Sequence, residues 1–379
     1  MIYLDNNAST QLHPEIKKTL FDFLLSDYGN PSSPHSYGNF SRGIVEEARM
    51  KVANLLNTDP YHVIFTSSGS EANNMILKSS IINSKPRVII SSVEHSSIRK
   101  TCEYLASLDI EITTIPVDDK GIINLEILQK EIMKGASLVS IQWVNNETGV
   151  IQPLQQIIDI CRKNGVKIHT DAAQALGKIS IDLKKVDVDF LTITGHKVHA
   201  LQGIGALYAK KLNSLVRMIH SGYEEYELRG GTENVLGILS FGKATELRLH
   251  KFEDINVAIK KMRDDFEQRL CNKFPEIRIN GSVETRAGNT TNLLFPDIEG
   301  RALMAQLNRG GVICSQTSAC TTQIPEPSHV LVAMGLSIDE AFASLRFSFS
   351  ELNSEKDEIK AVEIIEKVYS RLKLMKDYF

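Results

Sequence analysis

The stretch Thr194-Gly195-His196-Lys197 ends an apolar run and is soon followed by Gly203-Ile204-Gly205. An earlier apolar run ends in His169-Thr170-Asp171-Ala172-Ala173-Gln174. Since the carboxyl ends of parallel strands meet at one edge of a sheet, we expect Asp171 and Lys197 to approach each other there. A Lys amine can form a Schiff base with the aldehyde of pyridoxal 5'-phosphate, and an Asp carboxylate can keep its pyridine nitrogen protonated. Together, the two residues predict a site for pyridoxal 5'-phosphate. Considered alone, Lys197 would more often be a surface residue and Asp171 a helix cap.

Short apolar runs alternate with amphipathic helical stretches between about residue 60 and residue 210. Nearly all-apolar strands separated by helices are typical of a mostly parallel sheet that is covered on both faces. We therefore expect an α/β fold with its ligand site at the carboxyl ends of the strands. The expected strands are residues 63–65, 87–90, 112–115, 138–141, 166–169, 190–193 and 204–208. The polar side chains expected at that edge are Ser70, His95, Asn146, Asp171 and Lys197.

The pattern changes after Gly231 to that of a second, smaller α+β unit. We expect a long charged helical segment over about residues 235–272, weaker strands at 277–279 and 291–295, and an amphipathic helix over 354–373. We predict a large cofactor-binding domain over residues 13–250. The small domain would consist of residues 1–12 and 251–379.

The chain has 379 residues, 42% hydrophobic and 23% charged, which is ordinary for a soluble protein of about two domains. Its net charge of −3 gives no case for direct nucleic-acid binding, which needs a basic stripe to neutralise phosphates. No apolar run approaches the roughly 20 residues that span a bilayer, and the N-terminus lacks the features of a signal peptide. We therefore expect a cytoplasmic protein that does not bind membranes.

The five cysteines are an odd number without CxxC spacing, so we expect free thiols and neither a disulfide framework nor a metal site. Cys320 lies in a run of small polar residues that has no apolar periodicity. An exposed thiol on a loop is the usual setting of a reactive cysteine. We therefore predict that Cys320 lies on a loop over about residues 315–328 and is reactive. We assign the other cysteines to packing: Cys102, Cys161, Cys271 and Cys314.

Four further features have both a structural and a functional interpretation. Residues 66–74 follow a strand and open a helix, so their N–H groups and small side chains either cap that helix or bind a phosphate. His95 is either a surface residue or a side chain that stacks on a cofactor ring and relays protons. Asn146 is a turn former or a ligand of a phenolic oxygen. Arg346 alternates with apolar neighbours, so its partner is a structural carboxylate or a substrate carboxylate.

Taken together, these segments resemble the cysteine desulfurases over nearly the whole chain. Each motif is weak alone, but all of them occur in the order of that family. The matching segments are residues 3–10, 29–35, 66–74, 94–95, 144–147, 171–174, 195–197, 229–234 and 318–320. The interval from Ala319 to Ser328 is similar to that of the group with a long cysteine loop, which includes the nitrogen-fixation and iron–sulfur-cluster desulfurases.

This resemblance implies an aspartate-aminotransferase-like fold (fold type I) with a mixed, mostly parallel seven-stranded sheet, and a homodimer with shared active sites. Lys197 would carry pyridoxal 5'-phosphate, Asp171 would pair with its pyridine nitrogen, and His95 would stack on its ring. Gln174 and Asn146 would contact the phenolic oxygen. The remaining cofactor contacts would be Gly69, Ser70, Thr194 and His196 around the phosphate, with Thr232 reaching in from the other subunit.

The implied reaction converts L-cysteine to L-alanine, leaves the sulfur as a persulfide on Cys320 and passes it to an acceptor protein. Arg346 and Asn30 would hold the substrate carboxylate, and Lys197 or His95 would remove the α-proton. The acceptor would serve iron–sulfur cluster assembly or the thio-modification of nucleic acid. The alternatives are a selenocysteine lyase, an aminotransferase or another lyase of the same fold, or a sulfur-relay scaffold with weak activity.

The chain departs from the family pattern at three places. Residues 200–203 are Ala-Leu-Gln-Gly where the family usually has Gly-Pro-Lys-Gly, and Gly230 stands where Ser is usual. Residues 220–227 form an acidic, aromatic segment in place of a flexible and basic one. We expect these changes to affect substrate affinity, rate or partner choice and to leave the core chemistry intact.

Overall fold

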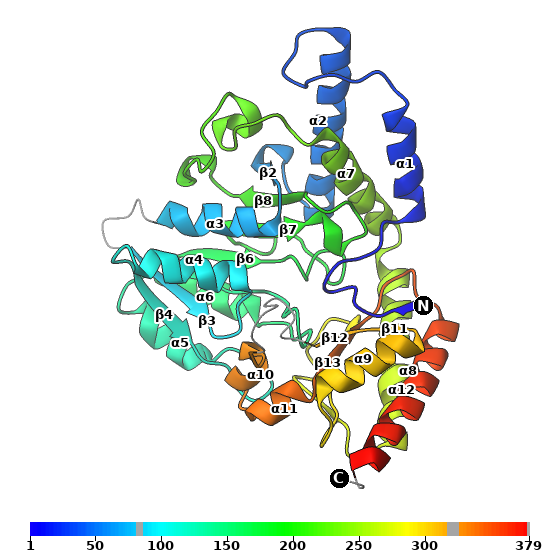
Figure 1. The fold of residues 1–379 in the computed structure, drawn as a ribbon. Coiled ribbons are helices and arrows are strands. Elements are labelled where there is room, and N and C mark those ends of the chain that lie inside the picture. Colours follow the sequence, from blue (N-terminus) through cyan, green and yellow to red (C-terminus); the bar gives the residue numbers. More distant parts are fainter. Residues whose placement is uncertain (81–85, 317–325, 377–379) are drawn as a thin grey trace.

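The computed structural model describes residues 1–80, 86–316 and 326–376 of the chain (Figure 1). These residues form a seven-stranded, a four-stranded and a two-stranded sheet. The large sheet and its helices occupy one part of the molecule, and the two smaller sheets lie beside α8, α9 and α12 in the other (Figure 1). These three helices are Phe252–Lys273, Gly300–Gly310 and Glu355–Lys376.

The seven-stranded sheet has the order β2-β8-β7-β6-β5-β3-β4. Neighbouring strands are parallel except at β8, which is antiparallel to both β2 and β7. The fold class predicted from the sequence is thereby confirmed, and each predicted strand of this region overlaps an observed one. The strands are β2 Val63–Thr66, β3 Arg87–Ser91, β4 Glu111–Ile115, β5 Leu138–Ser140, β6 Lys167–Asp171, β7 Phe190–Thr194 and β8 Gly205–Ala209.

The connection from β7 to β8 explains the reversed direction of β8. A parallel pair needs a long crossover, usually through a helix, whereas a short connection joins antiparallel strands. This connection holds only the 3-10 helix η3, Gly195–Lys197, and a turn in which Gly203 has a φ of 78°. A Cβ on Gly205 would lie 2.6 Å from the carbonyl carbon of Ser68, so a glycine is required there. The end of β7 and the segment before α3 are therefore neighbours.

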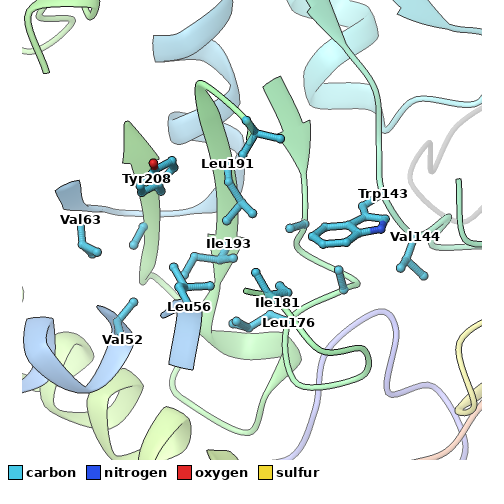
Figure 2. Packing of buried hydrophobic residues seen from close by; sticks show 14 of the residues in the cluster. Val52, Leu56, Val63, Trp143, Val144, Leu176, Ile181, Leu191, Ile193 and Tyr208 are labelled. Atoms are coloured by element: carbon cyan, nitrogen blue, oxygen red, sulfur yellow. The ribbon is translucent and has the colours of Figure 1, made fainter. Parts of the chain in front are cut away.

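Alternate strand residues face two separate apolar cores. Ile64 and Ile90 pack with α3 and α4 on one face of the sheet. Val63 and Ile89 point to the other face and pack with helices α1, α2, α5, α6 and α7 (Figure 2). The covering helices are α1 Pro14–Leu24, α2 Ser36–Leu56, α3 Gly69–Ser79, α4 Ser96–Ala106, α5 Leu125–Ile132, α6 Leu154–Lys163 and α7 Val235–His250.

A third core joins the first residues of the chain to its last third. Leu4, Phe266, Phe347 and Tyr369 are all buried in it. The four-stranded antiparallel sheet has the order β12-β13-β10-β9, and β1 pairs with β11 in parallel. The two-domain division stays a prediction, which this separate core supports. The strands are β1 Ile2–Tyr3, β9 Arg278–Ile279, β10 Thr290–Leu294, β11 Val312–Ile313, β12 Ser315–Gln316 and β13 Ser344–Ser348.

The helical segment predicted over about residues 235–272 is confirmed, and it consists of two helices. Lys251, with φ −127° and ψ 23°, separates α7 from α8. Phe241 of α7 packs in the core of the large sheet, whereas Phe266 of α8 packs in the third core. Each half has helical periodicity, but the two halves bury their apolar faces against different sheets.

The remaining short helices are α10 His329–Ala333, α11 Ile338–Phe342, η1 Pro60–His62, η4 Leu212–Ser214 and η5 Glu224–Glu227. Among the helices described here, none combines the length and apolar character needed to cross a bilayer. The described residues also include no group of three or more His, Cys, Asp or Glu side chains placed to hold a metal ion. Four cysteines are free thiols: Cys102, Cys161 and Cys314 are buried, and Cys271 is partly buried.

Candidate active site

Asp171 ends β6 with its carboxylate buried at the edge of the large sheet, where the residue is only 4% exposed. Its Oδ1 accepts a hydrogen bond of 2.9 Å from the backbone N of Ala173, and its Oδ2 accepts one of 2.8 Å from Asn73 Nδ2. Asn73 belongs to α3. A carboxylate held in this way can accept a hydrogen bond from a protonated pyridine nitrogen.

His95 caps α4 just beyond the end of β3. Its Nδ1 accepts a hydrogen bond of 3.2 Å from the backbone N of Ser97 and lies 2.8 Å from Ser97 Oγ. Burial lowers the pKa of His95, the charge of Asp171 opposes this shift, and the charge of Lys197 adds to it. The imidazole is therefore neutral at pH 7, and these three predicted residues belong to one electrostatic site.

Lys197 lies in η3, directly after β7. Its Nζ donates a hydrogen bond of 2.8 Å to the backbone O of Ala8 and another to the backbone O of Asn7. The same N-terminal segment contacts His196, whose backbone O accepts a 2.8 Å bond from the backbone N of Thr10. The start of the chain thus crosses from the small sheets to the end of β7 and positions the amine of Lys197.

Asn7 joins three of the predicted residues. Its backbone O accepts a 2.9 Å bond from Gln174 Nε2 as well as the bond from Lys197, and its Nδ2 donates a 3.1 Å bond to the backbone O of Asn146. Lys178 donates to Gln174 Oε1 and, at 3.0 Å, to Asn7 Oδ1. Burial lowers the pKa of Lys178 well below its usual value, and the charge of Lys197 adds to this shift. Because the amine of Lys178 donates to Oε1, it fixes which way the side-chain amide of Gln174 is turned.

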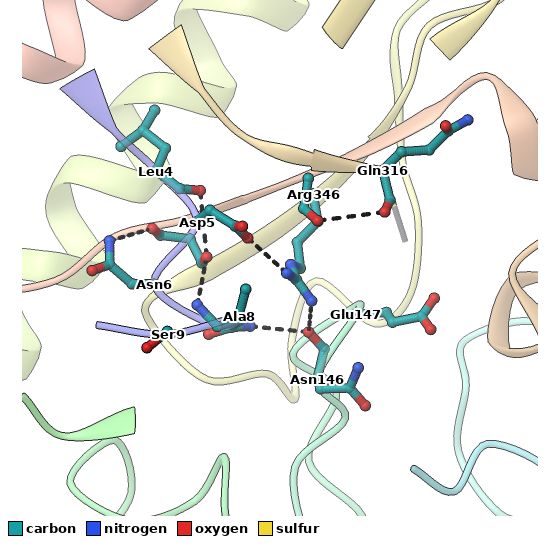
Figure 3. A network of polar contacts seen from close by, with 12 residues as sticks. Leu4, Asp5, Asn6, Ala8, Ser9, Asn146, Glu147, Gln316 and Arg346 are labelled. Carbon is teal, nitrogen blue, oxygen red and sulfur yellow. Dashed lines mark hydrogen bonds and ion pairs between the residues drawn. The ribbon is translucent and has the colours of Figure 1, made fainter. Parts of the chain in front are cut away.

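Arg346 lies on β13 between the N-terminal segment and Asn146 (Figure 3). Its Nη2 is 2.7 Å from Asp5 Oδ1, and its Nη1 donates a 2.9 Å bond to the backbone O of Asn146. Its Nε is buried and has no hydrogen-bond partner among the described residues. The guanidinium thus makes the structural ion pair that was one of the two interpretations drawn from the sequence, and its binding of a substrate carboxylate stays a prediction.

The start of α3 lies against the end of β7. A Cβ on Gly69 would be 3.6 Å from Thr194 Cβ, so these two predicted residues are neighbours. Gly69 and Ser70 form the first turn of the helix, after the N-cap Ser68. N–H groups in a first turn have no intrahelical acceptor and, with the helix dipole, favour an anion. Nearby, burial lowers the pKa of His196 to about 4, so this side chain is neutral.

An ion pair connects the start of α3 to the segment that carries Thr232. Arg229 Nε lies 3.0 Å from Glu71 Oε1, and both side chains are largely buried. Thr232 is exposed in this chain. Its contact with a phosphate in a second subunit stays a prediction.

Asn30 does not join the other predicted residues. It is exposed, and its Oδ1 accepts a 2.9 Å bond from the backbone N of Ser32 in the connection between α1 and α2. This connection and β13, which carries Arg346, lie in different parts of the molecule (Figure 1). A role for Asn30 beside a substrate therefore requires a second copy of the chain, and it stays a prediction.

Cys320 lies outside the described residues, but the residues that flank its segment are described. On one side, Gln316 ends β12, and Ser315 pairs with Arg346 across the sheet. Gln316 Nε2 also donates a 2.6 Å bond to the backbone O of Phe342. The segment therefore begins beside the strand that carries Arg346.

The other side of the same segment is attached to the large sheet. Ser328 donates a hydrogen bond to the carboxylate of Glu147, and His329 Nε2 lies 3.0 Å from the backbone O of Glu94. Glu147 follows Asn146 in the sequence, and Glu94 precedes His95. The segment therefore ends beside two further residues of the predicted site.

The two unusual segments are fixed to the rest of the fold. After Lys197, Ala200 is buried, and Gln202 Nε2 donates a 3.2 Å bond to Ser9 Oγ. In the acidic segment, Glu225 accepts two 2.8 Å bonds from Arg49 and a 2.7 Å bond from the backbone N of Phe65. This segment therefore includes a buried ion pair that ties it to α2 and β2.

Sequence reasoning missed the roles of Asn7, Asn73 and Lys178. Asn73 lies on the buried face of α3 between Ala72 and Met75, and a polar residue on an apolar helix face is the signal that could have found it. Asn7 has no comparable signal, because its partners come from distant parts of the chain, and Lys178 bonds to Asn7 as well as to the nearby Gln174.

The residues present fit pyridoxal phosphate. A buried, hydrogen-bonded carboxylate at Asp171 suits the pyridine nitrogen, and the glycine-containing first turn of α3 suits the phosphate. Lys197 and Gln174 converge on Asn7, which places an amine and an amide on the same side of the site. The arrangement therefore supplies the groups that the aldehyde, ring and phosphate of this cofactor require.

Comparisons with known proteins agree with this site. Residues 2–362 match the family described as aminotransferase class-V. A cysteine desulfurase from Trichormus azollae is 38% identical over 383 residues, which cover 100% of this chain and 95% of that protein. The solved structure of a NifS-like protein is 32% identical, with a TM-score of 0.92 over 98% of this chain and 100% of its own. SspA in complex with cysteine is 29% identical, with a TM-score of 0.82 over 93% of this chain and 100% of its own.

These relatives are pyridoxal phosphate enzymes, so the cofactor predicted from Asp171 and Lys197 is confirmed. The matches extend over all three sheets and over the whole of the candidate site. The chain belongs to the class-V aminotransferase family and, within it, to the cysteine desulfurases.

Proposed function

We propose that this chain converts L-cysteine to L-alanine and takes up the sulfur atom as a persulfide on Cys320. The observation that carries this proposal is the attachment of the Cys320 segment at both ends. It begins at Gln316, beside the strand of Arg346, and it ends at Ser328 and His329, which bond to Glu147 and Glu94. The described residues on both sides of this segment therefore lie beside Arg346, Asn146 and His95, which supports Cys320 as the sulfur acceptor.

The overall reaction balances as L-cysteine plus the Cys320 thiol giving L-alanine plus the Cys320 persulfide. The C–S bond of the substrate breaks, an S–S bond forms to Cys320, and the carbon that loses sulfur gains a hydrogen. When bound, pyridoxal phosphate supplies the electron sink that makes the α-hydrogen acidic. Arg346 would bind the substrate carboxylate through its free Nε. Lys197 or His95 would remove the α-proton.

A homodimer and an acceptor protein are part of this proposal. Large apolar side chains on α1 and α2 are exposed in the single chain, among them Phe21 at 63% and Phe40 at 46%. This exposure supports a partner surface there, and Thr232 and Asn30 would act across it. Sedimentation of the loaded enzyme tests the dimer. Iron–sulfur assembly or nucleic-acid thiolation as the destination of the sulfur stays a prediction, as does the cytoplasmic location.

The test compares substrates and cysteine variants of the loaded enzyme. We expect alanine release from L-cysteine and a protein-bound persulfide that Cys320→Ala abolishes. Cys271→Ala is the matched control and should retain the persulfide, because that thiol lies in α8. Lys197→Ala should lose the absorbance of the bound cofactor. A persulfide that survives in Cys320→Ala, or turnover of selenocysteine or an amino group acceptor in preference to cysteine, would overturn the proposal.

A further inference from the structure

Two polar side chains, those of Asn73 and Ser97, connect Asp171 to His95 through hydrogen bonds. Asn73 Nδ2 lies 2.8 Å from Asp171 Oδ2 and 2.9 Å from Ser97 Oγ, and Ser97 Oγ lies 2.8 Å from His95 Nδ1. Asn73 is 1% exposed and Asp171 is 4% exposed. The residue that would pair with the pyridine nitrogen is thus linked to the one that would stack on the ring.

The direction of these hydrogen bonds follows from the acceptor at one end. An ionised Asp171 can only accept, so Asn73 must direct its amide nitrogen toward it. The other orientation would place the amide oxygen of Asn73 against a carboxylate oxygen. The second N–H of the same amide then donates to Ser97 Oγ. Since this hydroxyl accepts from Asn73, its own hydrogen is available for His95 Nδ1.

A second bond gives the same assignment independently. The backbone N of Ser97 donates to His95 Nδ1 at 3.2 Å, because His95 is the N-cap of α4. A backbone N–H is always a donor, so this bond also favours an Nδ1 without a hydrogen, although at 3.2 Å it is longer than the 2.8 Å contact of Nδ1 with Ser97 Oγ. A neutral imidazole whose Nδ1 is unprotonated has its hydrogen on Nε2. Burial, which lowers the pKa of His95, keeps the ring neutral.

We propose that Asn73 and Ser97 are positioning residues that hold His95 in the tautomer with its hydrogen on Nε2. This inference rests on the proposed function, in which His95 lies against the cofactor. In this tautomer His95 offers the site a hydrogen-bond donor and has no free lone pair for a proton. Removal of the α-proton then belongs to the amine of Lys197, which decides between the two bases that the sequence left open.

The experiment is ¹⁵N NMR of the loaded enzyme labelled in its histidines, since protonated and unprotonated ring nitrogens resonate separately. His95 is assigned by the signal that disappears in His95→Gln. We expect a protonated Nε2 and an unprotonated Nδ1. Asn73→Asp replaces the donor to Ser97 by an acceptor, so Ser97 should turn its hydroxyl toward residue 73 and Nδ1 should gain a hydrogen. A wild-type enzyme protonated at Nδ1 would overturn the inference.

Asn74→Asp is the matched control, because it makes the same substitution on the same helix at a side chain that donates to the backbone O of Ser70. It should retain the wild-type tautomer. If Asn73→Asp fails to fold, Ser97→Ala and Ser97→Thr make the same test, since only Thr keeps the hydroxyl. Unchanged ring signals in folded Asn73→Asp or Ser97→Ala would overturn the role of the altered residue.

A kinetic measurement tests the assignment of the base. We expect His95→Gln, whose amide can still donate, to retain exchange of the α-hydrogen of L-alanine with deuterated water, and loss of that exchange would make His95 the base. The tautomer is measured without substrate. An enzyme with the expected tautomer that does not act on L-cysteine would therefore overturn the proposed function and leave the positioning role of Asn73 intact.

Discussion

Arg346 Nη2 lies 2.7 Å from Asp5 Oδ1, so the guanidinium expected to bind the substrate carboxylate is itself held by a carboxylate of the N-terminal segment (Figure 3). The Arg346 side chain is 7% exposed and that of Asp5 is 18% exposed. The same segment holds the amine of Lys197 through the carbonyls of Asn7 and Ala8. The first residues of the chain therefore fix two reactive groups at once.

Replacing Asp5 by Asn should weaken both the fold and substrate binding. We expect a loss of about 2 kcal/mol in the free energy of unfolding, below the roughly 3–5 kcal/mol of a fully buried pair because Asp5 is partly exposed. The KM for L-cysteine should rise about tenfold with a smaller change in kcat, since Arg346 loses its orientation. Urea unfolding and steady-state kinetics measure the two effects.

Asp265→Asn is the control for this change. Asp265 pairs with Lys261 on the exposed side of α8, and such a pair contributes about 0.3–0.5 kcal/mol. Equal losses of stability in the two variants, or an unchanged KM in Asp5→Asn, would contradict the role given to Asp5.

Glu225→Gln should destabilise the chain by about 3 kcal/mol. Its carboxylate is 2% exposed and bonds to Arg49, which is 3% exposed, so the change leaves this buried charge with only the exposed Glu46 as a charged partner among the described residues. Gln keeps one acceptor, which places the expected loss at the lower end of the range for buried pairs. Glu227→Gln, two residues later, removes only an exposed pair with Arg217 and should cost less than about 0.5 kcal/mol. Similar urea midpoints for the two variants would refute this account.

Glu227→Gly should stabilise the chain. Glu227 has a φ of 64°, in the left-handed region that costs a residue with a Cβ about 1–2 kcal/mol. Glycine loses about 0.5–1 kcal/mol of this gain through its greater freedom when unfolded, so we expect a net gain of about 0.5–1 kcal/mol. Glu227→Ala removes the same carboxylate and keeps the strain, and it should show no gain in thermal unfolding. A gain in both variants would assign the effect to the charge.

The sequence predicted the large sheet well because most of its strands face two apolar cores and are rich in apolar residues. It did not predict the break at Lys251, because α7 and α8 have the same periodicity and differ only in the core they join. It also did not predict that β8 alone is antiparallel, which depends on the short connection through η3.

The site was predictable where chemistry lies at the ends of strands. Asp171, His95 and Lys197 occupy such ends, and the structure brings them into one electrostatic site. Asn73 and Asn7 were not predictable in the same way, because each acts on a partner far along the chain. Asn73 is 98 residues from Asp171, and Asn7 is 139 residues from Asn146.

The pH dependence of stability should contain a contribution from Glu94. This residue is fully buried beside Ser91 and Gln142, and burial raises its pKa from 4.5 to about 8. Between pH 4.5 and about pH 8, Glu94 is protonated in the folded chain and ionised in the unfolded chain. The free energy of unfolding from this group therefore falls as the pH rises from about 4.5 to about 8.

Glu94→Gln removes this titration and imitates the protonated acid. Relative to wild type, the variant should become more stable between pH 5 and pH 8 by at least about 1.4 kcal/mol, which corresponds to one pKa unit. Burial lowers the pKa values of His169 and His196 to about 4, so their contribution to stability is lost as the pH falls below about 6.5. This loss is the same in both proteins and therefore cancels in the difference between them. Glu126→Gln on the exposed side of α5 should differ from wild type by a constant amount. Urea unfolding at each pH measures these differences, and a Glu94→Gln difference that stays constant would show that Glu94 is ionised in the folded chain.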